Sequence, residues 1–489
     1  MRRNVEFELI EKFEKNLNIK EVKKVSNILF NTSIYQASYN AQKINKLNQN
    51  FSLDLIGLPV ENQHKSGRCW LFAATNFIRE QIAKKLNLDN LSLSNAYLAF
   101  WDKIERSNFF LEAMIENINK PLDDRLVRHF LRTGIEDGGQ WDMAVNLIEK
   151  YGVVPYDVMK DTAHAADTQT INYLLNWKLR DFTAELRKDI DKSPENLSRK
   201  KEQMMKEIFK LLQTFYGEIP QTFDFEYSID LEKVKEADDN LFYTDSYDKY
   251  TRRYFLDKNL TPQSFYQKYV DIKLDEFISI IHAPQDTKDF FKLYTFKYLN
   301  NVIEGRPVLH CNVPLDLFKY LIWEQLEKTK LPVWFGSDVS WFRDWISGTW
   351  DDQLFDIENL FNTSFQLKKG EQLTYRTSFM THAMVIVGLN SNQEENYSLD
   401  LSNFSSYEQW SLAAKKMDFN RWKIENSWGD DVGYYGYWTI SGSWFDKYTY
   451  QAVVSKKLLV EALNNLNLPS IEEQVTENLD PWDPIGTLA

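Results

Sequence analysis

The chain has 489 residues, 43% hydrophobic and 26% charged, and its 71 acidic and 58 basic side chains give a net charge of −13. This length exceeds a single hydrophobic core, so we expect several domains or one domain with large insertions. The composition is typical of a globular protein. Its negative charge argues against a general nucleic-acid surface, and no run of about 18 apolar residues predicts a membrane helix.

The cysteine content and the N-terminal residues indicate the cellular compartment in which the protein works. The two cysteines, Cys69 and Cys311, cannot form a disulfide scaffold, which favours a reducing environment. The N-terminal residues include two arginines but no apolar run of the kind that secretory signals contain. We therefore expect a cytoplasmic protein. No metal-ligand spacing and no phosphate-binding glycine loop occurs, so we expect neither a metal nor a cofactor.

The N-terminal third reads mainly as helix. Residues 1–50 are charged and then polar, and they predict an arm or surface layer. Residues 51–168 predict a helical half, in which residues 70–86 carry apolar side chains at helical spacing. Gly138 and Gly139 interrupt that pattern. Paired glycines serve equally as a plain turn or as a place where a ligand approaches the backbone, and the sequence leaves both possibilities open.

The middle of the chain, residues 169–300, predicts helical and hook-like insertions. Residues 169–216 read as a pair of charged helices, and residues 222–227 alternate like a strand. Thr261, followed by proline, has the side chain expected at the start of another helix.

The pattern changes to β in residues 301–462. Residues 393–418 are polar and irregular and predict a surface loop, and residues 463–489 predict a C-terminal tail. Strands are expected where β-branched and aromatic residues gather, at residues 302–313, 331–335, 383–389, 421–424, 435–440 and 452–454.

Cys69 is the centre of the predicted chemistry. It follows a flexible turn and directly precedes the predicted helix, whose dipole favours a thiolate at that end. Gln63 lies six residues upstream and offers an amide donor for an oxyanion. His382 and Asn426 follow far downstream, so nucleophile, base and orienting amide occur in that order. The set predicts an enzyme that performs acyl transfer on a thiol.

Two members of this set also have an interpretation without a catalytic role, and other residues compete with the set. Asn426 is compatible with an ordinary turn, and Gln63 with an exposed loop. His64 is a second, weaker candidate for the base because it lies close to the cysteine in sequence. Neighbours in a strand point to opposite faces, which argues against the rival set that composition allows, Cys311 with His310 and Asn312.

Several segments resemble one family of peptidases. They are similar, in order and from about residue 20 to the C-terminus, to the bleomycin hydrolase and bacterial aminopeptidase C group of papain-like cysteine peptidases. The segments are QHKSGRCWLFAATN, LSLSNAYLAFWDKIERSNFFLE, DGGQWDMAVNLIEKYGVVP, LPVWFGSDVS, SFMTHAMVIVG, IENSWGDDVGYYGYW and the ending WDPIGTLA.

The resemblance implies a role for each catalytic candidate. Cys69 is then the nucleophile, His382 its base, and Asn426 the group that orients the imidazole. Gln63 and the Cys69 backbone N–H hold the oxyanion. Trp428 shields the histidine–asparagine hydrogen bond and belongs to the substrate-binding surface.

The resemblance also implies a fold and an assembly. The fold class is α+β, a papain-like pair of helical and β halves with a cleft between them and large helical and hook-like insertions. The tail enters this cleft, and the carboxylate of Ala489 fixes the α-amino group of the substrate. Gly138 and Gly139 are candidates for binding the substrate backbone. Members assemble as homohexamers.

Three features depart from the family pattern. Cys69 and His382 lie much farther apart than the roughly 130–150 residues usual in small papain-like enzymes. Ser337 occupies a position where relatives often have cysteine. Residues 393–418 are longer than the family norm, which bears on specificity and assembly.

These observations together predict a cysteine aminopeptidase that acts on peptide substrates and needs no membrane or nucleic-acid partner. One alternative keeps the chemistry but leaves the cleft open, as in an oligo-endopeptidase. The other is a nucleic-acid-binding or scaffold protein, against which the net negative charge counts.

Overall fold

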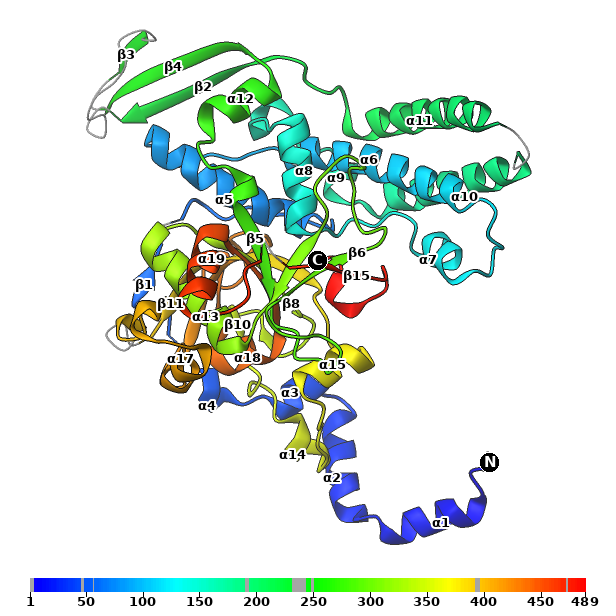
Figure 1. The fold of residues 1–489 in the computed structure, drawn as a ribbon. Coiled ribbons are helices and arrows are strands. Elements are labelled where there is room, and N and C mark those ends of the chain that lie inside the picture. The colour runs from blue at the N-terminus through cyan, green and yellow to red at the C-terminus, as the bar shows by residue number, and fades with distance from the viewer. Residues whose placement is uncertain are drawn as a thin grey trace.

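The computed structural model describes residues 4–44, 48–55, 57–189, 193–230, 243–247, 250–391, 396–471 and 474–489. A helical part and a β part face each other, and the C-terminus lies in the middle of the molecule between them (Figure 1). None of the helices in these described ranges is long and apolar enough to cross a bilayer.

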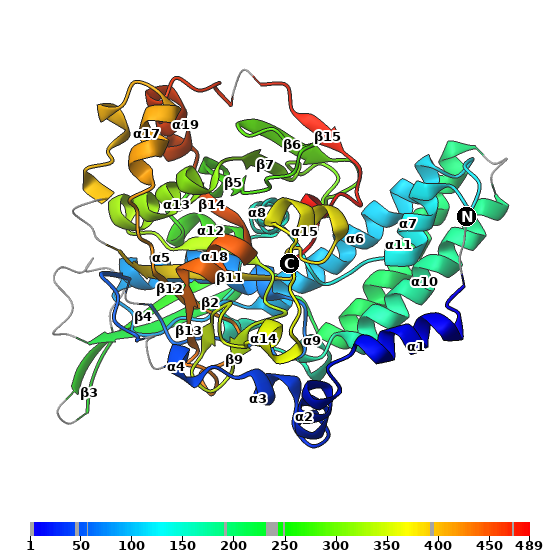
Figure 2. The same cartoon turned by 90° about the horizontal axis from the view of Figure 1, so that it is seen from below.

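A mixed sheet forms the β part (Figure 2). Its central strands are rich in β-branched and aromatic residues that are buried on both faces, because helices and the helical part cover them. In the part of the chain that the structure describes, the strand order is β15 (Glu477–Leu479), β6 (Lys292–Phe296), β7 (Leu309–Asn312), β5 (Phe277–Ile281), β14 (Thr449–Ser455), β8 (Val333–Ser337), β11 (His382–Asn390), β12 (Arg421–Glu425), β13 (Tyr437–Ser441), β10 (Thr349–Trp350) and β9 (Arg343–Asp344), with β1 (Leu53–Asp54) paired to β11.

The helical part contains α5 (Cys69–Leu86) at its centre. Most of its side chains are buried because α5 packs against β11 on one side and against neighbouring helices on the other. The other helices of this part are α6 (Asn95–Glu116), α7 (Arg125–Thr133), α8 (Trp141–Tyr151), α9 (Ala163–Ala166), α10 (Gln169–Lys188), α11 (Pro194–Tyr216) and α12 (Pro262–Tyr269).

The predicted insertions are helical and then β. The expected pair of charged helices is α10 and α11, which pack on α6 through apolar stripes with helical spacing. The strand expected at 222–227 is β2 (Phe223–Asp230), which pairs with β4 (Tyr250–Leu260) and through it with β3 (Tyr243–Tyr247) in a separate sheet that projects from the body (Figure 1). Thr261 caps α12 as predicted.

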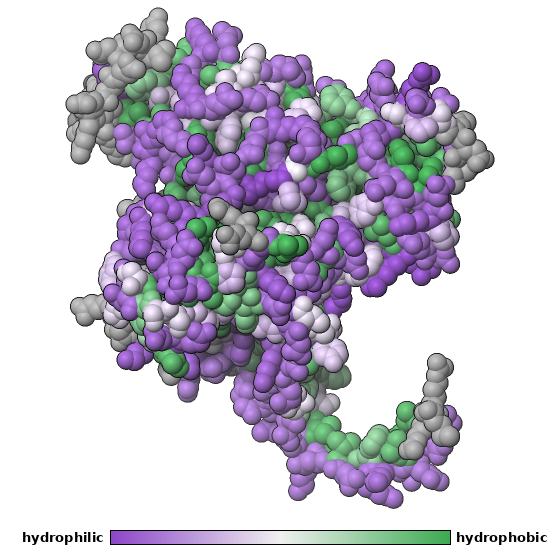
Figure 3. Space-filling view, viewed as in Figure 1, coloured by the Kyte–Doolittle hydropathy of each residue, from purple (hydrophilic) through white to green (hydrophobic). Residues whose placement is uncertain are grey.

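The N-terminal arm packs on the β part through α3 (Ile34–Ser38), and its first two helices extend away from the body (Figure 1). It consists of α1 (Phe7–Asn16), α2 (Ile19–Leu29), α3 and α4 (Ala41–Ile44). Neither α1 nor α2 buries a residue, and a stripe of apolar side chains lies open along them (Figure 3). The exposed apolar residues of α1, α2 and their flanks are Val5, Phe7, Leu9, Ile10, Phe13, Leu17, Ile19, Val22, Ile28 and Phe30.

The sheet differs in two places from the predicted elements. The boundary expected at residue 301 cuts through the sheet, because β5 and β6 precede it and pair with β7. The strand expected at 302–313 is shorter, since residues 302–305 form a turn and β7 begins only at Leu309.

The surface loop expected at 393–418 is wrong where a helix forms within it. Residues 392–395 lie outside the described residues, but α17 (Tyr407–Ala414) is a helix with Ser406 as its N-cap. Trp410 is fully buried on Tyr320, so this apolar face covers the sheet-side core. The remaining helices of the β part are α13 (Leu315–Glu324), α14 (Ile357–Phe361), α15 (Lys369–Tyr375), α18 (Gly442–Tyr448) and α19 (Lys456–Asn465).

Candidate active site

Cys69 is the first residue of α5 and is buried between the two parts of the molecule. The turn before it is held by Arg68, whose guanidinium forms a buried ion pair with Asp161 at 2.8 Å. Burial raises the pKa of the thiol, and the backbone groups of Ala383, Trp70 and Cys69 itself act in the opposite direction. The sulfur lies at a helix N-terminus, which is a favourable place for negative charge.

His382 begins β11, which packs on α5, and it directly precedes Ala383, whose backbone acts on the pKa of the Cys69 thiol. Its Nε2 lies 2.8 Å from Oδ1 of Asn426, which follows the end of β12. The Ser427 N–H also donates to this Oδ1 at 2.8 Å, which fixes it as the acceptor. Nε2 consequently carries the proton, and Nδ1 is left as the nitrogen that accepts one from a thiol.

Burial disfavours a charge on either group alone. It raises the pKa of the Cys69 thiol to about 11. It lowers the pKa of His382 to about 4, with Asn426 acting in the opposite direction and Arg343 adding to the decrease. Transfer of the proton from the thiol to the imidazole creates both charges together, so that each stabilises the other.

Trp428 covers the histidine. Its ring stacks on His382 with centroids 4.9 Å apart and is itself half-buried. The Trp345 ring lies next to Trp428, with ring centroids 5.0 Å apart. The indole therefore excludes water from one face of the imidazole, next to its hydrogen bond with Asn426.

The Gln63 amide lies on the same network. Its Oε1 accepts from the Ser427 hydroxyl at 2.6 Å, and its Nε2 donates to the Ser66 carbonyl at 2.6 Å. An amide nitrogen has two N–H groups, and this arrangement uses one of them. Gln63 is thus a buried and oriented residue beside Asn426, rather than an exposed loop residue.

The glycine pair lies against the last residue of the chain. Gly139 N–H donates to a terminal oxygen of Ala489, and Ala489 N–H donates to the Gly139 carbonyl, both at 3.1 Å. A Cβ on Gly138 would lie 2.5 Å from the Ala489 oxygen, and one on Gly139 would lie 2.3 Å from the Trp70 ring. Both positions therefore require glycine, Gly138 because the backbone of Ala489 approaches closely and Gly139 because the Trp70 ring does.

The loop that contains Gly138 and Gly139 is tied to the turn before Cys69 and to Trp70. Trp70 Nε1 donates to the Asp137 carbonyl at 2.7 Å, and Gly67 N–H donates to the Asp137 carboxylate at 3.3 Å. The Lys103 ammonium and the Thr168 hydroxyl also bind this carboxylate. Although burial opposes the charge, these partners hold the pKa of Asp137 well below its usual range.

Contacts along the C-terminal tail hold its end in place. Gln140 Nε2 donates to the Thr487 carbonyl at 2.6 Å, and Lys288 pairs with Asp483 at 2.9 Å in a largely buried ion pair. Arg125 stacks over the ring of Trp482 at 4.1 Å. Gln140, Lys288 and Arg125 were not recognised from the sequence, because their tail partners are far away in the chain and nothing local marks them.

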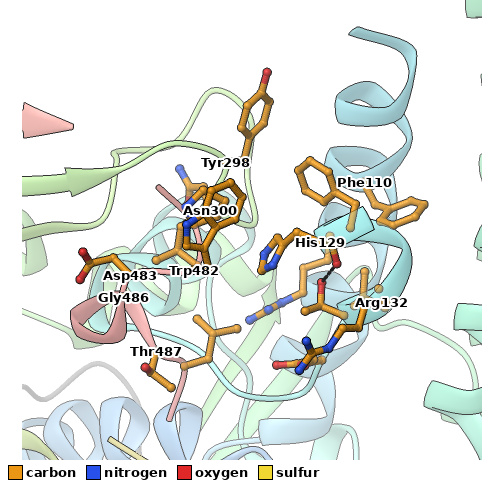
Figure 4. A pocket seen from close by; sticks show the side chains of 18 of the residues that line it. Phe110, His129, Arg132, Tyr298, Asn300, Trp482, Asp483, Gly486 and Thr487 are labelled. Atoms are coloured by element: carbon orange, nitrogen blue, oxygen red, sulfur yellow. Dashed lines mark hydrogen bonds between the residues drawn. The ribbon is translucent and has the colours of Figure 1, made fainter. Parts of the chain in front are cut away.

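A cavity of about 700 Å³ adjoins the tail (Figure 4). Trp482, Gly486 and Thr487 lie along one side of it, with His129 and Arg132 of α7 opposite. The tail therefore borders an open space on one side and the glycine pair on the other.

The other candidate residues lie away from this network. Cys311 and His310 are fully buried in β7, where His310 Nδ1 contacts the Ser279 hydroxyl at 2.9 Å. Burial raises the pKa of Cys311 to about 12 and lowers that of His310 to about 3. Asn312 donates to backbone carbonyls of a neighbouring loop. His64 is exposed, so these residues belong to the core or the surface.

Ser337, at a position where cysteine is frequent in the family that the sequence resembles, is opposite His382 in the β8–β11 pairing. Its hydroxyl hydrogen-bonds to the Thr449 hydroxyl at 3.0 Å. The serine thus has a structural partner within the sheet.

Known proteins similar to this chain cover its full length. A model of the peptidase C1-like family matches residues 4–403 and 411–486. Aminopeptidase C of Lactobacillus delbrueckii subsp. lactis is 37% identical over 100% of this chain and 99% of its own length. Aminopeptidase C of Listeria innocua serovar 6a is 35% identical over 100% of both chains. The crystal structure of PepW from Lactobacillus rhamnosis HN001 is 36% identical, with a TM-score of 0.85 over 100% of both chains, which confirms the predicted α+β two-part fold.

Proposed function

The chain belongs to the peptidase C1-like family, and from this premise we propose that it is a cysteine aminopeptidase that releases N-terminal residues from peptides. The family and the names of its relatives support the reaction class. The arrangement of Cys69, His382 and Asn426 supports the mechanism, and the position of Ala489 supports the restriction to N-termini.

The reaction begins with transfer of the Cys69 proton to Nδ1 of His382. The thiolate attacks the scissile carbonyl carbon, and His382 then gives the proton to the departing amine as the C–N bond breaks. Water, deprotonated by His382, hydrolyses the thioester and regenerates the thiol. Asn426 holds the imidazole in the required tautomer throughout, through its 2.8 Å contact with Nε2.

Two donors stabilise the oxyanion that forms at the carbonyl. One is the backbone N–H of Cys69 at the start of α5. The other is the second N–H of the Gln63 amide, whose orientation is set by the contacts with Ser66 and Ser427. Donors that are fixed before the reaction need no reorganisation when charge develops.

The reciprocal hydrogen bonds between Ala489 and Gly139 are the observation that carries the exopeptidase proposal. A segment of the chain itself makes the pair of backbone bonds that an extended peptide would make there. The terminal carboxylate then meets the free ammonium group of a substrate and leaves no room for a preceding residue.

The proposed organisation follows the expected segments: an arm at 1–50, a helical half at 51–168, insertions at 169–300, a β half at 301–462 and the tail at 463–489. The strands β5 and β6, which lie inside the third segment, pair within the main sheet. The cleft is then formed between the second and fourth segments, which carry the nucleophile and the base.

We further propose that the chain assembles with copies of itself, as a hexamer by the resemblance, in the cytoplasm. The exposed apolar stripe of α1 and α2 supports an assembly, because Phe7 is 85% and Phe13 55% exposed and neither helix buries a residue. The unpaired thiols of Cys69 and Cys311 support a reducing compartment.

Replacement of the nucleophile tests the proposal. Cys69→Ala is expected to lower kcat on a free-amine peptide at least about 1,000-fold while the thermal unfolding midpoint stays close to that of the wild type. Cys311→Ala is the matched control, since it removes the other buried thiol outside the proposed site. Substantial turnover by Cys69→Ala, or loss of turnover in a folded Cys311→Ala protein, would contradict the assignment.

A further inference from the structure

The side of the site that receives the leaving group follows from the chemistry. His382 protonates the departing amine, so the departing part of the substrate lies beside His382. Ala489 blocks the opposite direction, along Gly139. The leaving part therefore passes over Trp428, which stacks on His382, and reaches Trp345, which lies 5.0 Å from Trp428.

Trp345 lines a separate cavity of about 610 Å³. Its walls are largely aromatic, and the N-terminal arm contributes Tyr35 and Tyr39, which pack on Phe355 at 5.0 and 6.1 Å. The arm thus bounds the space into which the leaving group extends. A bounded cavity suits a short leaving group better than a long chain.

Arg343 supplies the positive charge in the lining of this cavity. Its guanidinium stacks over Trp345 at 4.5 Å and lies 5.8 Å from the Trp428 ring. One nitrogen, Nη1, donates to the Val339 carbonyl at 3.3 Å. In the part of the chain that the structure describes, no carboxylate forms an ion pair with it.

The neighbouring carboxylate does not neutralise Arg343. Asp344 lines the same cavity, but its Oδ2 accepts from the backbone N–H and hydroxyl of Ser347 at 2.9 and 2.6 Å. Burial lowers the pKa of Arg343, and the charge of Arg343 in turn contributes to lowering the pKa of His382. A half-buried guanidinium with unused donors, close to the base, remains to be explained.

We propose that Arg343 binds a carboxylate on the leaving residue of the substrate. The guanidinium fork matches a carboxylate in geometry, and stacking on Trp345 holds the fork in place. The preferred substrates are then short peptides whose leaving residue carries a negative charge near the scissile bond. That charge is the α-carboxylate of a dipeptide or the side chain of an acidic residue. This inference rests on the proposed aminopeptidase function.

Four peptides with the same N-terminal leucine separate the two sources of charge. Leu-Ala is compared with Leu-Ala-amide for the α-carboxylate, and Leu-Glu-amide with Leu-Gln-amide for the side chain. The readout is the ratio of kcat/KM within each pair. We expect wild-type enzyme to favour the charged member of at least one pair about tenfold.

The same ratios in variants assign the preference to Arg343. Arg343→Gln is expected to reduce the favoured ratio to about one, and Arg343→Lys to keep part of it, because the ammonium retains the charge but not the fork. Arg421→Gln is the matched control: Arg421 is also half-buried and stacks on a ring, Phe51, away from this cavity. Its ratios are expected to equal those of the wild type.

Two results would overturn the inference. One is a wild-type ratio of one or less in both pairs, a result that needs no variant. The other is a wild-type preference for the charged peptide that Arg343→Gln leaves unchanged. A preference that Arg421→Gln lowers as much as Arg343→Lys does would count in the same way. Failure of the proposed function looks different, since the enzyme would then cleave none of the four peptides.

Discussion

At the scale of single residues, two glycines set the space in which the chain ends. Gly139 exchanges two backbone hydrogen bonds with Ala489, and Gly138 lies directly beneath the terminal oxygen. Neither glycine needs an unusual backbone conformation. They are required because a side chain at either position would occupy the place of the terminal residue or of the Trp70 ring.

Gly138→Ala is therefore expected to displace the end of the tail. Its Cβ would lie 2.5 Å from the Ala489 oxygen, so the terminal carboxylate must move. We expect kcat/KM on a free-amine peptide to fall about tenfold or more and cleavage of an N-acetylated peptide to appear. Steady-state kinetics on the two peptides measures this. If Gly138→Ala leaves kcat/KM unchanged on both peptides, the close contact between Gly138 and Ala489 has no role in selectivity.

Residue chemistry explains which parts of the site were visible in the sequence. Cys69, His382 and Asn426 belong to residue types that few other chemistries need in that order, so the sequence predicts them. The structure joins His382 to Asn426 and packs β11, which His382 begins, on α5, which Cys69 begins. Lys288 and Arg343 have side chains common on any surface. Their significance depends on partners that only the folded chain supplies, and sequence reasoning missed both.

At the scale of elements, a buried charge cluster joins α5 to β12. Arg79 of α5 is fully buried and pairs with Glu425, the last residue of β12, at 2.7 Å. Burial, together with the charge of Glu425, raises the pKa of Glu80 to about 8. One proton is thus retained by the pair of carboxylates at neutral pH. The cluster fixes the end of β12, next to Asn426, against the helix that carries the nucleophile.

Replacing Glu80 by glutamine tests this cluster through the pH dependence of stability. The folded pKa of Glu80 is raised above its ordinary value of 4.5, so the folded state keeps a proton that the unfolded state releases. The wild type therefore loses stability progressively as the pH rises from 4.5 to 8. Glu80→Gln removes this term.

The measurement is the free energy of unfolding by urea between pH 5 and pH 9. We expect the decline of stability with pH to be smaller in Glu80→Gln than in the wild type. Glu202→Gln, on the exposed face of α11, is the control and is expected to keep the wild-type slope. A parallel decline in Glu80→Gln and wild type would show that Glu80 is already ionised in the folded protein.

Elements were predictable where the local pattern and the tertiary environment agree. The strand expected at 421–424 alternates charged and apolar residues and forms as β12, and the apolar residues expected as a strand at 452–454 lie within the longer β14. Helix α17 was missed because its polar and small residues hide a short apolar face, of which only Trp410 and Ala414 are buried. The start of β7 was placed too early, since apolar content alone does not distinguish a turn that packs on the core from a strand.

At the scale of the whole molecule, the site depends on segments that are distant in the chain. Cys69 and His382 are separated by 313 positions, yet β11 packs directly on α5. Two cores, one on each face of the sheet, stabilise this arrangement. The sequence predicted a cleft between helical and β halves from the resemblance, but the contacts that seat the tail required the structure.

The tail is the part of the molecule that distinguishes an aminopeptidase from an enzyme with an open cleft. Its end is held by the Gln140–Thr487 hydrogen bond and the Lys288–Asp483 ion pair, so it is a seated element rather than a loose terminus. Removal of the last four residues leaves both Asp483 and the catalytic residues in the chain. The truncation therefore changes the substrate boundary without removing the proposed chemistry.

The most direct measurement is the cleavage of two matched fluorogenic peptides, one with a free α-amine and one acetylated, by full-length protein and by protein that lacks the last four residues. Truncated Cys69→Ala protein serves as the control for contaminating activity. We expect full-length enzyme to cleave only the free-amine peptide, and truncated enzyme to cleave the acetylated peptide as well. Efficient cleavage of the acetylated peptide by full-length enzyme would contradict the account, because the tail would not then close the cleft.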